Sequence, residues 1–498
     1  MKKVFGIAAL LLALAACNKE TEITPVEQTS DSKGITITAQ LAPKTDGATT
    51  RAVEDKTTYI EAKWAEHEHI AILYTVGSTK YVADATITAV DGGGAATITF
   101  TVDGGTTNDT PCTLVYPLSA AKDDKSGVKD AATLLAAQDG TLNANLDVRV
   151  GEGTIYTTTP GLTVTTQPAA QFAIWKLTLA NNAKNLCIMA DNITIAGATL
   201  GTEGTEFYVA VPAVSSKTVT IVANDASNNC YYYSKAGVSL ATGRYYQSSP
   251  TMTALGTESS ADVYKITATS DVTIPDGKTV VLSGVNISSG SITCNGSVTM
   301  ILIGANTVTA TNYKAAIKIG DSGTTLTITG SGSLTAQGGK SAAGIGTDRI
   351  GSGTLSCGNI VINGGTVTAT GGQFGAGIGT GRAQSASITC GDITINGGTV
   401  TATGGNNGGA GIGTGLSIGS SGTSNTCGAI TIGTGVTMVT ATKGGSAPNS
   451  IGKGEAQLSG TQTCGTITIG GTVYWDGSAY QNGGDTYLAT SSLIYTVG

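Results

Sequence analysis

Charged and aromatic residues are scarce in this sequence, and histidine is almost absent. Charged residues make up 12% of the 498 residues, aromatic residues make up 5%, and there are two histidines. The net charge of −7 excludes a nucleic-acid-binding protein, which needs a basic stripe for phosphate groups. No long stretch beyond the N-terminus has the periodicity of an amphipathic helix, so a helical fold is excluded as well.

Glycine and β-branched residues are abundant instead. Glycine accounts for 71 residues, which is about twice its average usage. Threonine, valine and isoleucine favour β-strands, and they are numerous enough to bury a core, which argues against disorder. The composition therefore predicts an all-β protein with many turns, and the length predicts two or three domains.

The N-terminal segment has the pattern of an export signal. Two lysines precede an apolar run, Phe5–Ala16, which is too short to span a bilayer. The run ends in Leu-Ala-Ala before Cys17, which resembles the lipobox of bacterial lipoproteins. This resemblance implies removal of residues 1–16, lipidation of Cys17 and a tether at residues 17–33. An ordinary cleaved signal followed by a chance cysteine is the alternative.

A repeat dominates the C-terminal half. Each unit combines a Gly-Ile-Gly strand, a strand around a Cys-Gly pair, and a Gly-Thr-Val-Thr-Ala-Thr strand. Stacked units of this kind bury equivalent apolar residues on one another, so we expect a right-handed parallel β-helix over residues 251–498. A β-propeller is the rival, but its blades need four strands. The central isoleucines, separated by 33, 34 and 39 residues, are Ile345, Ile378, Ile412 and Ile451.

The stretch between the Gly-Ile-Gly strand and the cysteine strand varies in length from repeat to repeat. Variation in a solenoid is accommodated by loops at one edge of the stack. The sequence therefore predicts a segment that protrudes from one edge of the β-helix.

Cysteine recurs at one position of the repeat. Equivalent residues of a solenoid line up about one strand spacing apart, not around a tetrahedron, so we expect a ladder of buried thiols and no zinc site. An odd number of further cysteines in the front half leaves their pairing open. The ladder positions are Cys357, Cys390, Cys427 and Cys464, with Cys294 expected at the same place in an earlier coil, and the front-half residues are Cys112, Cys187 and Cys230.

The two histidines flank an acidic residue. His67 and His69, on either side of Glu68, would face the same side of a strand. Two ligands are too few for a metal site, so a solvated strand edge is the expectation. We predict neither a metal nor a cofactor.

Strand and turn signals alternate through the front half. Ile35–Gln40, Ala95–Val102 and Thr218–Val222 are examples of short strands bounded by turn residues. Their spacing predicts antiparallel β-sandwiches, which we place at residues 34–165 and 166–250.

Landmarks in the front half follow a characteristic order. Together they resemble the fimbrillin family, the subunits of lipoprotein-derived pili, and this implies a transthyretin-like, pilin-type β-sandwich. The family usually has aspartate where this chain has Glu68. The landmarks are Trp64 with Glu68 and Ile70, Tyr116-Pro117, Gln138-Asp139-Gly140, Phe207–Pro212 and Leu240–Tyr246.

The resemblance implies a route of assembly and a location. Fimbrillin-type subunits are cut after an arginine, and Arg51-Ala52 lies at the matching place. The cut frees a groove for a neighbouring subunit's strand, held by main-chain hydrogen bonds; a simple surface loop is the alternative. Because a solenoid occupies the C-terminus, we expect a pilus-tip or accessory adhesin on an outer-membrane lipid anchor, at the cell surface or on a fimbrium. A stand-alone carbohydrate-binding lipoprotein is the second hypothesis.

The repeat region shows no set of paired carboxylates, so we expect no enzyme; a polysaccharide-degrading enzyme is the third hypothesis. Its Gly/Thr/Ile repeats resemble β-helical domains called carbohydrate-binding, which implies a host or microbial glycan, or a surface protein, as partner. A small charged patch follows consecutive Gly-Ile-Gly strands, although solubilising loop charges are the alternative. Asn363 and Asn396 match between repeats and fit a ligand surface or a turn-capping ladder. The candidate ligand-binding residues are Asp348, Arg349 and Arg382 by charge, and Phe374, Trp475 and Tyr480 by stacking.

Overall fold

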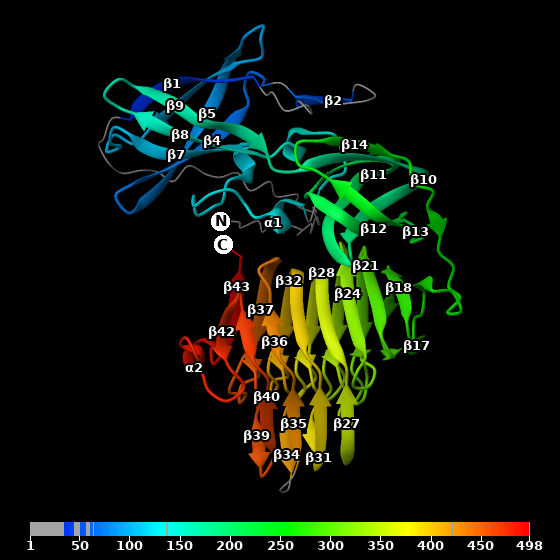
Figure 1. Ribbon diagram of the computed structural model, residues 1–498. Helices are drawn as coiled ribbons and strands as arrows, with labels where there is room; N and C mark the ends of the chain where they lie inside the picture. Colours follow the sequence, from blue (N-terminus) through cyan, green and yellow to red (C-terminus); the bar gives the residue numbers. More distant parts are fainter. Residues whose placement is uncertain are drawn as a thin grey trace, which may run out of the picture.

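The protein is built almost entirely from β-strands, as predicted. Figure 1 shows two sheet domains above a solenoid of parallel strands. Within the part of the chain that is described, no helix is long and apolar enough to cross a membrane. The computed structural model describes residues 34–43, 50–55, 60–62, 64–135, 138–419 and 423–497, and only the backbone at 50–55 and 60–62.

The first domain is a seven-stranded antiparallel sheet in the order β1-β6-β5-β4-β7-β8-β9. Its edge strands approach each other, because the N–H of Ala42, just after β1, donates to Gln167 Oε1 on β9 at 3.3 Å. Alternate residues such as Ile37, Ile72 and Ile98 are buried in the core between them. The strands are β1 (Ile35–Leu41), β4 (His69–Val76), β5 (Thr79–Val90), β6 (Ala96–Val102), β7 (Thr110–Tyr116), β8 (Arg149–Tyr156) and β9 (Gly161–Ala170).

Smaller elements accompany this sheet. A separate pair is formed by β2 (Thr50–Asp55) and β3 (Ile60–Ala62). The connection from β7 to β8 holds η1 (Leu118–Ala120), α1 (Ala131–Leu135) and η2 (Ala144–Leu146).

The second domain is a six-stranded sheet in which β14 pairs with β10 in parallel and the other pairs are antiparallel. The predicted division at residue 165 falls inside β9, because Ala170 still pairs with Arg149 of β8. The second sheet also extends past residue 250. Its strands are β10 (Ala173–Ala190), β11 (Ile193–Val211), β12 (Val214–Asn224), β13 (Cys230–Leu240), β14 (Tyr245–Ser248) and β15 (Thr253–Ala254).

Several landmark residues of the front half form ring contacts and hydrogen bonds with one another or with the second domain. Trp64 is only 3% exposed, and its ring lies edge-on to Tyr116, with ring centroids 5.3 Å apart. The Tyr116 hydroxyl donates to Glu68 Oε1 at 3.1 Å. The Gln138 side chain donates to the Ala210 carbonyl (2.9 Å) and accepts from its N–H (2.7 Å). The contacts of Trp64, Tyr116 and Glu68 lie within the first domain, whereas those of Gln138 join the β7–β8 connection to β11 of the second domain.

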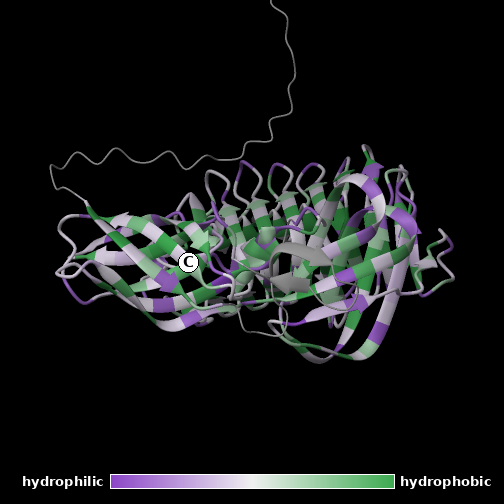
Figure 2. Ribbon diagram, turned by 90° about the horizontal axis from the view of Figure 1, so that it is seen from above, coloured by the Kyte–Doolittle hydropathy of each residue, from purple (hydrophilic) through white to green (hydrophobic). Residues whose placement is uncertain are grey.

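The third domain is a parallel β-helix, which confirms the solenoid prediction. Its main sheet runs β16-β18-β21-β24-β28-β32-β36-β41-β42, and a second sheet runs β17-β20-β23-β26-β29-β33-β38. In Figure 2 hydrophobic residues recur from coil to coil along it. The main-sheet strands are β16 (Val263–Ile266), β18 (Lys278–Ser283), β19 (Asn286–Ile287), β21 (Val298–Ile303), β22 (Ala305–Thr309), β24 (Thr325–Gly330), β25 (Ser333–Gln337), β28 (Asn359–Thr370), β32 (Ile393–Thr403), β36 (Ile430–Ile432), β37 (Val436–Thr442), β41 (Ile467–Ile469), β42 (Thr472–Trp475) and β43 (Ser492–Thr496).

The Gly-Ile-Gly motifs form the second sheet. The four central isoleucines pair in register and are fully buried. Each following glycine has a positive φ, from 118° to 141°, and asparagine Asn396 donates to Asn363 Oδ1 at 2.9 Å, so the asparagine ladder also forms. The strands are β17 (Val272–Pro275), β20 (Ile292–Asn295), β23 (Ile317–Lys318), β26 (Ile345–Gly346), β29 (Ile378–Gly379), β33 (Ile412–Gly413) and β38 (Ile451–Gly452).

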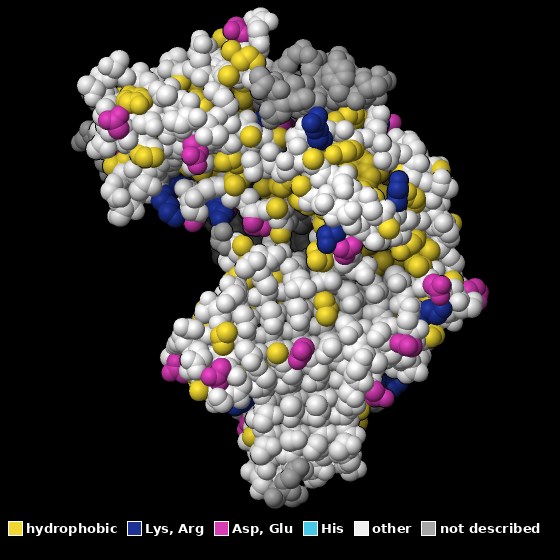
Figure 3. All heavy atoms as spheres, in the orientation of Figure 1, with side chains coloured by type: hydrophobic (Ala, Val, Ile, Leu, Met, Phe, Trp, Pro, Cys, Tyr) yellow, Lys and Arg dark blue, Asp and Glu magenta, His cyan; other side chains and the backbone are white. Residues whose placement is uncertain are grey.

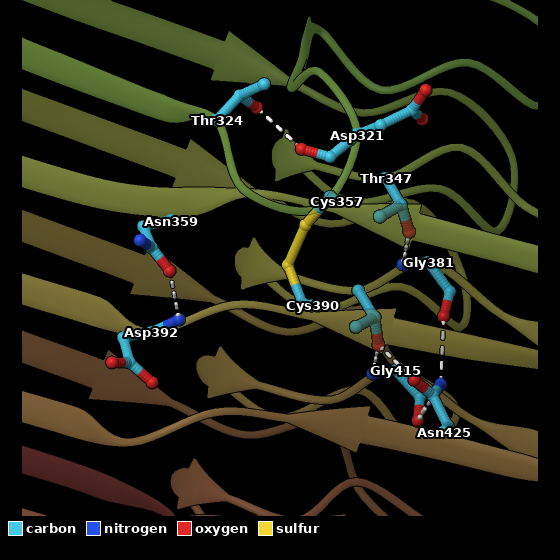
Figure 4. The surroundings of a disulfide bond; sticks show 11 residues. Asp321, Thr324, Thr347, Cys357, Asn359, Gly381, Cys390, Asp392, Gly415 and Asn425 are labelled. Atoms are coloured by element: carbon cyan, nitrogen blue, oxygen red, sulfur yellow. Dashed lines mark hydrogen bonds between the residues drawn. A yellow bond between two sulfur atoms is a disulfide. The ribbon is translucent and has the colours of Figure 1, made fainter. Parts of the chain in front are cut away.

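Two small sheets project from the solenoid on the side away from the front half (Figure 1), as the variable repeat length predicts. Their interior is narrow and polar: Asn425 donates to the carbonyls of Gly381 (3.1 Å) and Gly415 (3.2 Å) (Figure 4). The strands are β27 (Gly353–Cys357), β31 (Ala386–Cys390), β35 (Ser424–Cys427) and β40 (Thr461–Cys464) in one sheet, and β30 (Ala383–Gln384), β34 (Ser417–Gly419) and β39 (Ala456–Leu458) in the other.

The cysteine ladder forms, but not entirely from free thiols. Cys357, Cys390, Cys427 and Cys464 are register partners on consecutive strands. The first two form a disulfide (Figure 4), which corrects the prediction of a ladder of thiols alone. Adjacent coils bring their Cα atoms to 4.6 Å, within the range that a disulfide requires. Cys294 is not part of the ladder, because it lies on β20 in the Gly-Ile-Gly sheet.

The second domain packs directly on the solenoid. Outward-facing residues of β18 and β21 meet the outer face of β10, β12 and β13 in an apolar cluster. Thr194 Oγ1 accepts from the N–H of Gly330 at 2.8 Å, and Asn224 Nδ2 donates to Ser283 Oγ at 2.8 Å. This interface fixes the solenoid to its support. The cluster comprises Cys187, Met189, Val222, Cys230, Val281, Ile301 and Ile303.

Candidate ligand-binding edge

One edge of the β-helix is held by a repeated backbone hydrogen bond. In four successive coils, the residue that leaves the Gly-Ile-Gly strand donates its N–H to the carbonyl of a loop residue in the preceding coil. The side chains at these positions are therefore stacked in two columns. The pairs are Arg349 to Tyr313 (3.0 Å), Arg382 to Ser341 (2.8 Å), Leu416 to Phe374 (2.8 Å) and Glu455 to Gly408 (2.7 Å).

The two arginines are neighbours in this column and are flanked by aromatic rings. The Arg349 guanidinium carbon lies 4.4 Å from the ring centroid of Tyr313, and that of Arg382 lies 4.8 Å from the ring centroid of Phe374. Arg349 Nη2 also donates to Gln384 Oε1 at 2.6 Å. Tyr313 is 44% exposed. We call these five residues the arginine edge.

The carboxylates near the arginine edge form ion pairs with lysines. Asp348 accepts from the N–H of Ala315 at 2.8 Å and forms an ion pair with Lys318 at 2.9 Å. Asp271 forms an ion pair with Lys314 at 2.5 Å, which lowers the pKa of Asp271. Asp348 is therefore next to the arginine edge in sequence but is turned toward the previous coil.

Neither arginine has an acidic partner among the residues that the structure describes. Burial, and then the charge of Arg349, lower the pKa of Arg382. The Nε atoms of both arginines are buried without a hydrogen-bond partner in the described part of the chain. Buried polar atoms without a partner are uncommon in folded proteins, and two of them lie side by side at this edge.

Trp475 and Tyr480 lie elsewhere. They close the C-terminal end of the solenoid with β42, β43 and α2 (Gly484–Tyr487). Trp475 is 8% exposed, and its Nε1 donates to the Cys464 carbonyl at 3.0 Å. Lys453 and Tyr480 cover the ring. Trp475 therefore cannot offer a face to a ligand, which corrects the prediction for this residue, because its large apolar surface is used to cover the last coil.

The histidines do not form a pair on one strand. His67 lies in a turn with φ of 68°, and β4 begins at His69. His69 Nδ1 lies 2.7 Å from Asp84 Oδ1 at an exposed site. Within the described residues there is no group of three or more His, Cys, Asp or Glu side chains that could hold a metal.

The structure describes the predicted cleavage site, Arg51-Ala52, but not the predicted lipidation site, Cys17. Arg51 and Ala52 lie on β2, whose partner is the three-residue β3, and not in a loop. Cys17 lies outside the described residues. Upstream of β2, β1 is an edge strand, and among the described strands it pairs with β6 alone.

Together, the fold and the edge define an all-β protein in which two sheet domains support a parallel β-helix. A family model described as Beta helix repeat matches residues 326–349, 360–382 and 393–416. These matches agree with the coils that the structure shows. No curated protein matches the chain.

Solved structures with similarity to this chain include fimbrial proteins, the class that the front-half landmarks resemble. A fimbrial assembly protein from Parabacteroides distasonis is 13% identical, with 44% of this chain and 91% of that chain covered, at a TM-score of 0.25. The tip fimbrial protein Mfa3 from Porphyromonas gingivalis, with a C-terminal truncation, is 9% identical, with 43% and 94% covered, at a TM-score of 0.22. Scores this low define no function for the chain.

Proposed function

We propose that this protein is a non-catalytic cell-surface adhesin whose β-helix binds a saccharide at the arginine edge. The observation that carries the proposal is the pair of adjacent arginines, Arg349 and Arg382, which lie between Tyr313 and Phe374 without an acidic partner in the described chain. Guanidinium groups and exposed aromatic rings supply hydrogen-bond donors and stacking surfaces for a polar ligand.

The architecture suits display of a ligand-binding module. The apolar cluster between the second domain and the solenoid, together with two polar contacts, holds the solenoid in one orientation. On the face shown in Figure 3, most of the solenoid surface is neither hydrophobic nor charged, and its charges gather mainly at the margins. A weakly charged surface of this kind leaves the arginine edge as a distinct feature.

Attachment through a lipid at Cys17 and a location on a fimbrium belong to the same proposal. Cleavage after Arg51 would separate β1 from the rest of the chain and expose the edge of β6 to a partner's strand. Digestion with an arginine-specific protease tests this step. A fragment that begins at Ala52 and co-purifies with fimbrial subunits supports assembly, whereas uncleaved, lipid-anchored protein supports a stand-alone adhesin.

The pairing of carboxylates supports a non-catalytic role. Asp348 and Asp271 are each neutralised by a lysine, so neither is positioned as one of two facing carboxylates for hydrolysis. Incubation of the protein with polysaccharides should release no reducing ends and no unsaturated sugars. Either product would replace adhesion with catalysis.

The first test of the proposed function is a glycan-array screen of the full chain, with and without calcium. The double variant R349A/R382A serves as the site control. Selective binding by the native chain, lost in the double variant, is the expected result. Binding that survives in the variant would move the site away from this edge, and a blank array would contradict a glycan-binding adhesin.

A further inference from the structure

The geometry points to a saccharide ligand that carries an anionic group, a carboxylate or a sulfate, which bridges Arg349 and Arg382. This inference rests on the proposed function and names the chemical class of its ligand.

The spacing of the two arginines favours a single shared anion. They occupy equivalent positions in adjacent coils, as the pairing of Ile350 with Ala383 shows, so their backbones are about one strand spacing, ~4.8 Å, apart. Side chains that leave backbone positions this close together can direct their guanidinium groups at one anion. One carboxylate or sulfate, with oxygens separated by about 2 Å, can accept from both.

The surrounding charges leave this pair without compensation. Asp348, the acidic residue nearest in sequence, is paired with Lys318 in the neighbouring coil. Like charges held close together repel, and partial burial strengthens the repulsion. No carboxylate of the described chain pairs with either arginine, so an anion bound between Arg349 and Arg382 lowers an existing electrostatic repulsion in addition to forming hydrogen bonds.

The side chains are already held in place. Tyr313 and Phe374 stack on the two guanidinium groups from opposite ends of the pair, and Gln384 fixes Arg349 with a 2.6 Å hydrogen bond. A guanidinium that is ordered before binding loses less side-chain entropy when the ligand arrives. Stacking on an aromatic ring also leaves the edge donors of the guanidinium available.

The column limits the anion site to two coils. After Arg382 the next residues in the same column are Leu416, which is fully buried, and Glu455. A polyanion cannot continue along the column, because the carboxylate of Glu455 would repel it. The edge therefore recognises one acidic group at a defined point, with neutral sugar units on either side.

The test is a calorimetric titration of the full chain with three oligosaccharides of equal length. One probe is a glucan oligomer that carries a single glucuronate unit, one is the same oligomer with a single sulfate group and one is the unmodified neutral oligomer. The variants are R349Q, R382Q and R382K, and K235Q on the second domain controls for net charge. Circular dichroism confirms that each variant is folded.

We expect a carboxylated or sulfated probe to bind and the neutral probe to bind at least about tenfold more weakly. R349Q and R382Q should each lose about tenfold or more, R382K should lose part of that because a lysine has no planar fork, and K235Q should lose nothing. Which acidic probe binds distinguishes carboxylate from sulfate recognition.

Three results overturn the inference. If the neutral probe binds equally well and still depends on the arginine edge, the anionic ligand is contradicted and the proposed adhesin function is not. If none of the three probes binds and the glycan array is blank, the proposed function is contradicted as well. Weakening by K235Q equal to that by R382Q would show that net charge, and not the arginine pair, is responsible.

Discussion

The glycine that follows each central isoleucine offers a sharp test of how the coils stack. Gly413 and Gly452 occupy the same position in consecutive coils, with φ of 131° and 118°. A Cβ on Gly413 would overlap the carbonyl oxygen of Gly452 in the next coil. A Cβ on Gly452 would meet only the end of the flexible Ile467 side chain, at 2.9 Å. We therefore predict that G413A is much more destabilising than G452A.

The magnitude follows from two contributions. Both variants place alanine at a positive φ that only glycine readily adopts, which costs about 1–3 kcal/mol. In G413A the strands must also separate, and the 3.0 Å hydrogen bond from the N–H of Thr414 to the Gly452 carbonyl is lost. A buried group without its partner costs a further ~1–3 kcal/mol. G413A should therefore lower the free energy of unfolding by roughly 2–6 kcal/mol, and G452A by its conformational part alone.

Urea unfolding followed by far-ultraviolet circular dichroism and by tryptophan fluorescence measures the difference. Because a multidomain chain need not unfold in one step, the transition assigned to the solenoid is the one to compare. Equal losses in G413A and G452A would show that backbone conformation alone requires these glycines. The account of coil-on-coil contact would then be wrong.

Three further predictions concern the core, the interface and the thiols. W475A should lower the free energy of unfolding of the solenoid by about 3–5 kcal/mol, because the ring covers the last coil. The control Y480A, at a 43% exposed residue, should cost much less. Equal effects of the two variants in urea unfolding would contradict a capping role for Trp475. I301A should lower the free energy of unfolding by about 2–5 kcal/mol and make the contact between the second domain and the solenoid accessible to limited proteolysis. The control I494A, at a 61% exposed position, should change little. An unaltered digestion pattern in I301A would argue against the interface. Burial raises the pKa values of Cys112, Cys187 and Cys294 to about 12, so these groups remain thiols at pH 8. Mass spectrometry should therefore find them alkylated by iodoacetamide only after denaturation. Rapid labelling of the native protein would contradict their burial.

Much of the solenoid could be predicted because its information is local and repeated. A Gly-Ile-Gly strand, a Cys-Gly corner and an asparagine turn recur at nearly constant intervals, and stacking is the arrangement that buries them all. The protruding edge was predictable for the same reason, because the stretch after the Gly-Ile-Gly strand differs in length between repeats. The placement of Cys294 was wrong, since the earlier coils have no protruding strand and their cysteine falls on another sheet.

The interface between the second domain and the solenoid has a signal in the sequence. Val280-Val281-Leu282 and Met300-Ile301-Leu302-Ile303 are continuous apolar runs, whereas a strand with one solvated face alternates. Such runs indicate burial on both faces. The structure shows why: Val281, Ile301 and Ile303 point outward into the second domain while their neighbours face the solenoid interior.

The sequence by itself determined the all-β composition, the repeat and its approximate period. These properties depend on residue type and spacing along one chain. Only the tertiary structure decided that Asp348 turns toward Lys318 and leaves Arg349 and Arg382 uncompensated, that Cys357 and Cys390 are bonded, and that Trp475 is buried. Each of these depends on which side chains from different coils meet, and the direction in which a side chain leaves its turn is set by contacts that a linear pattern does not contain.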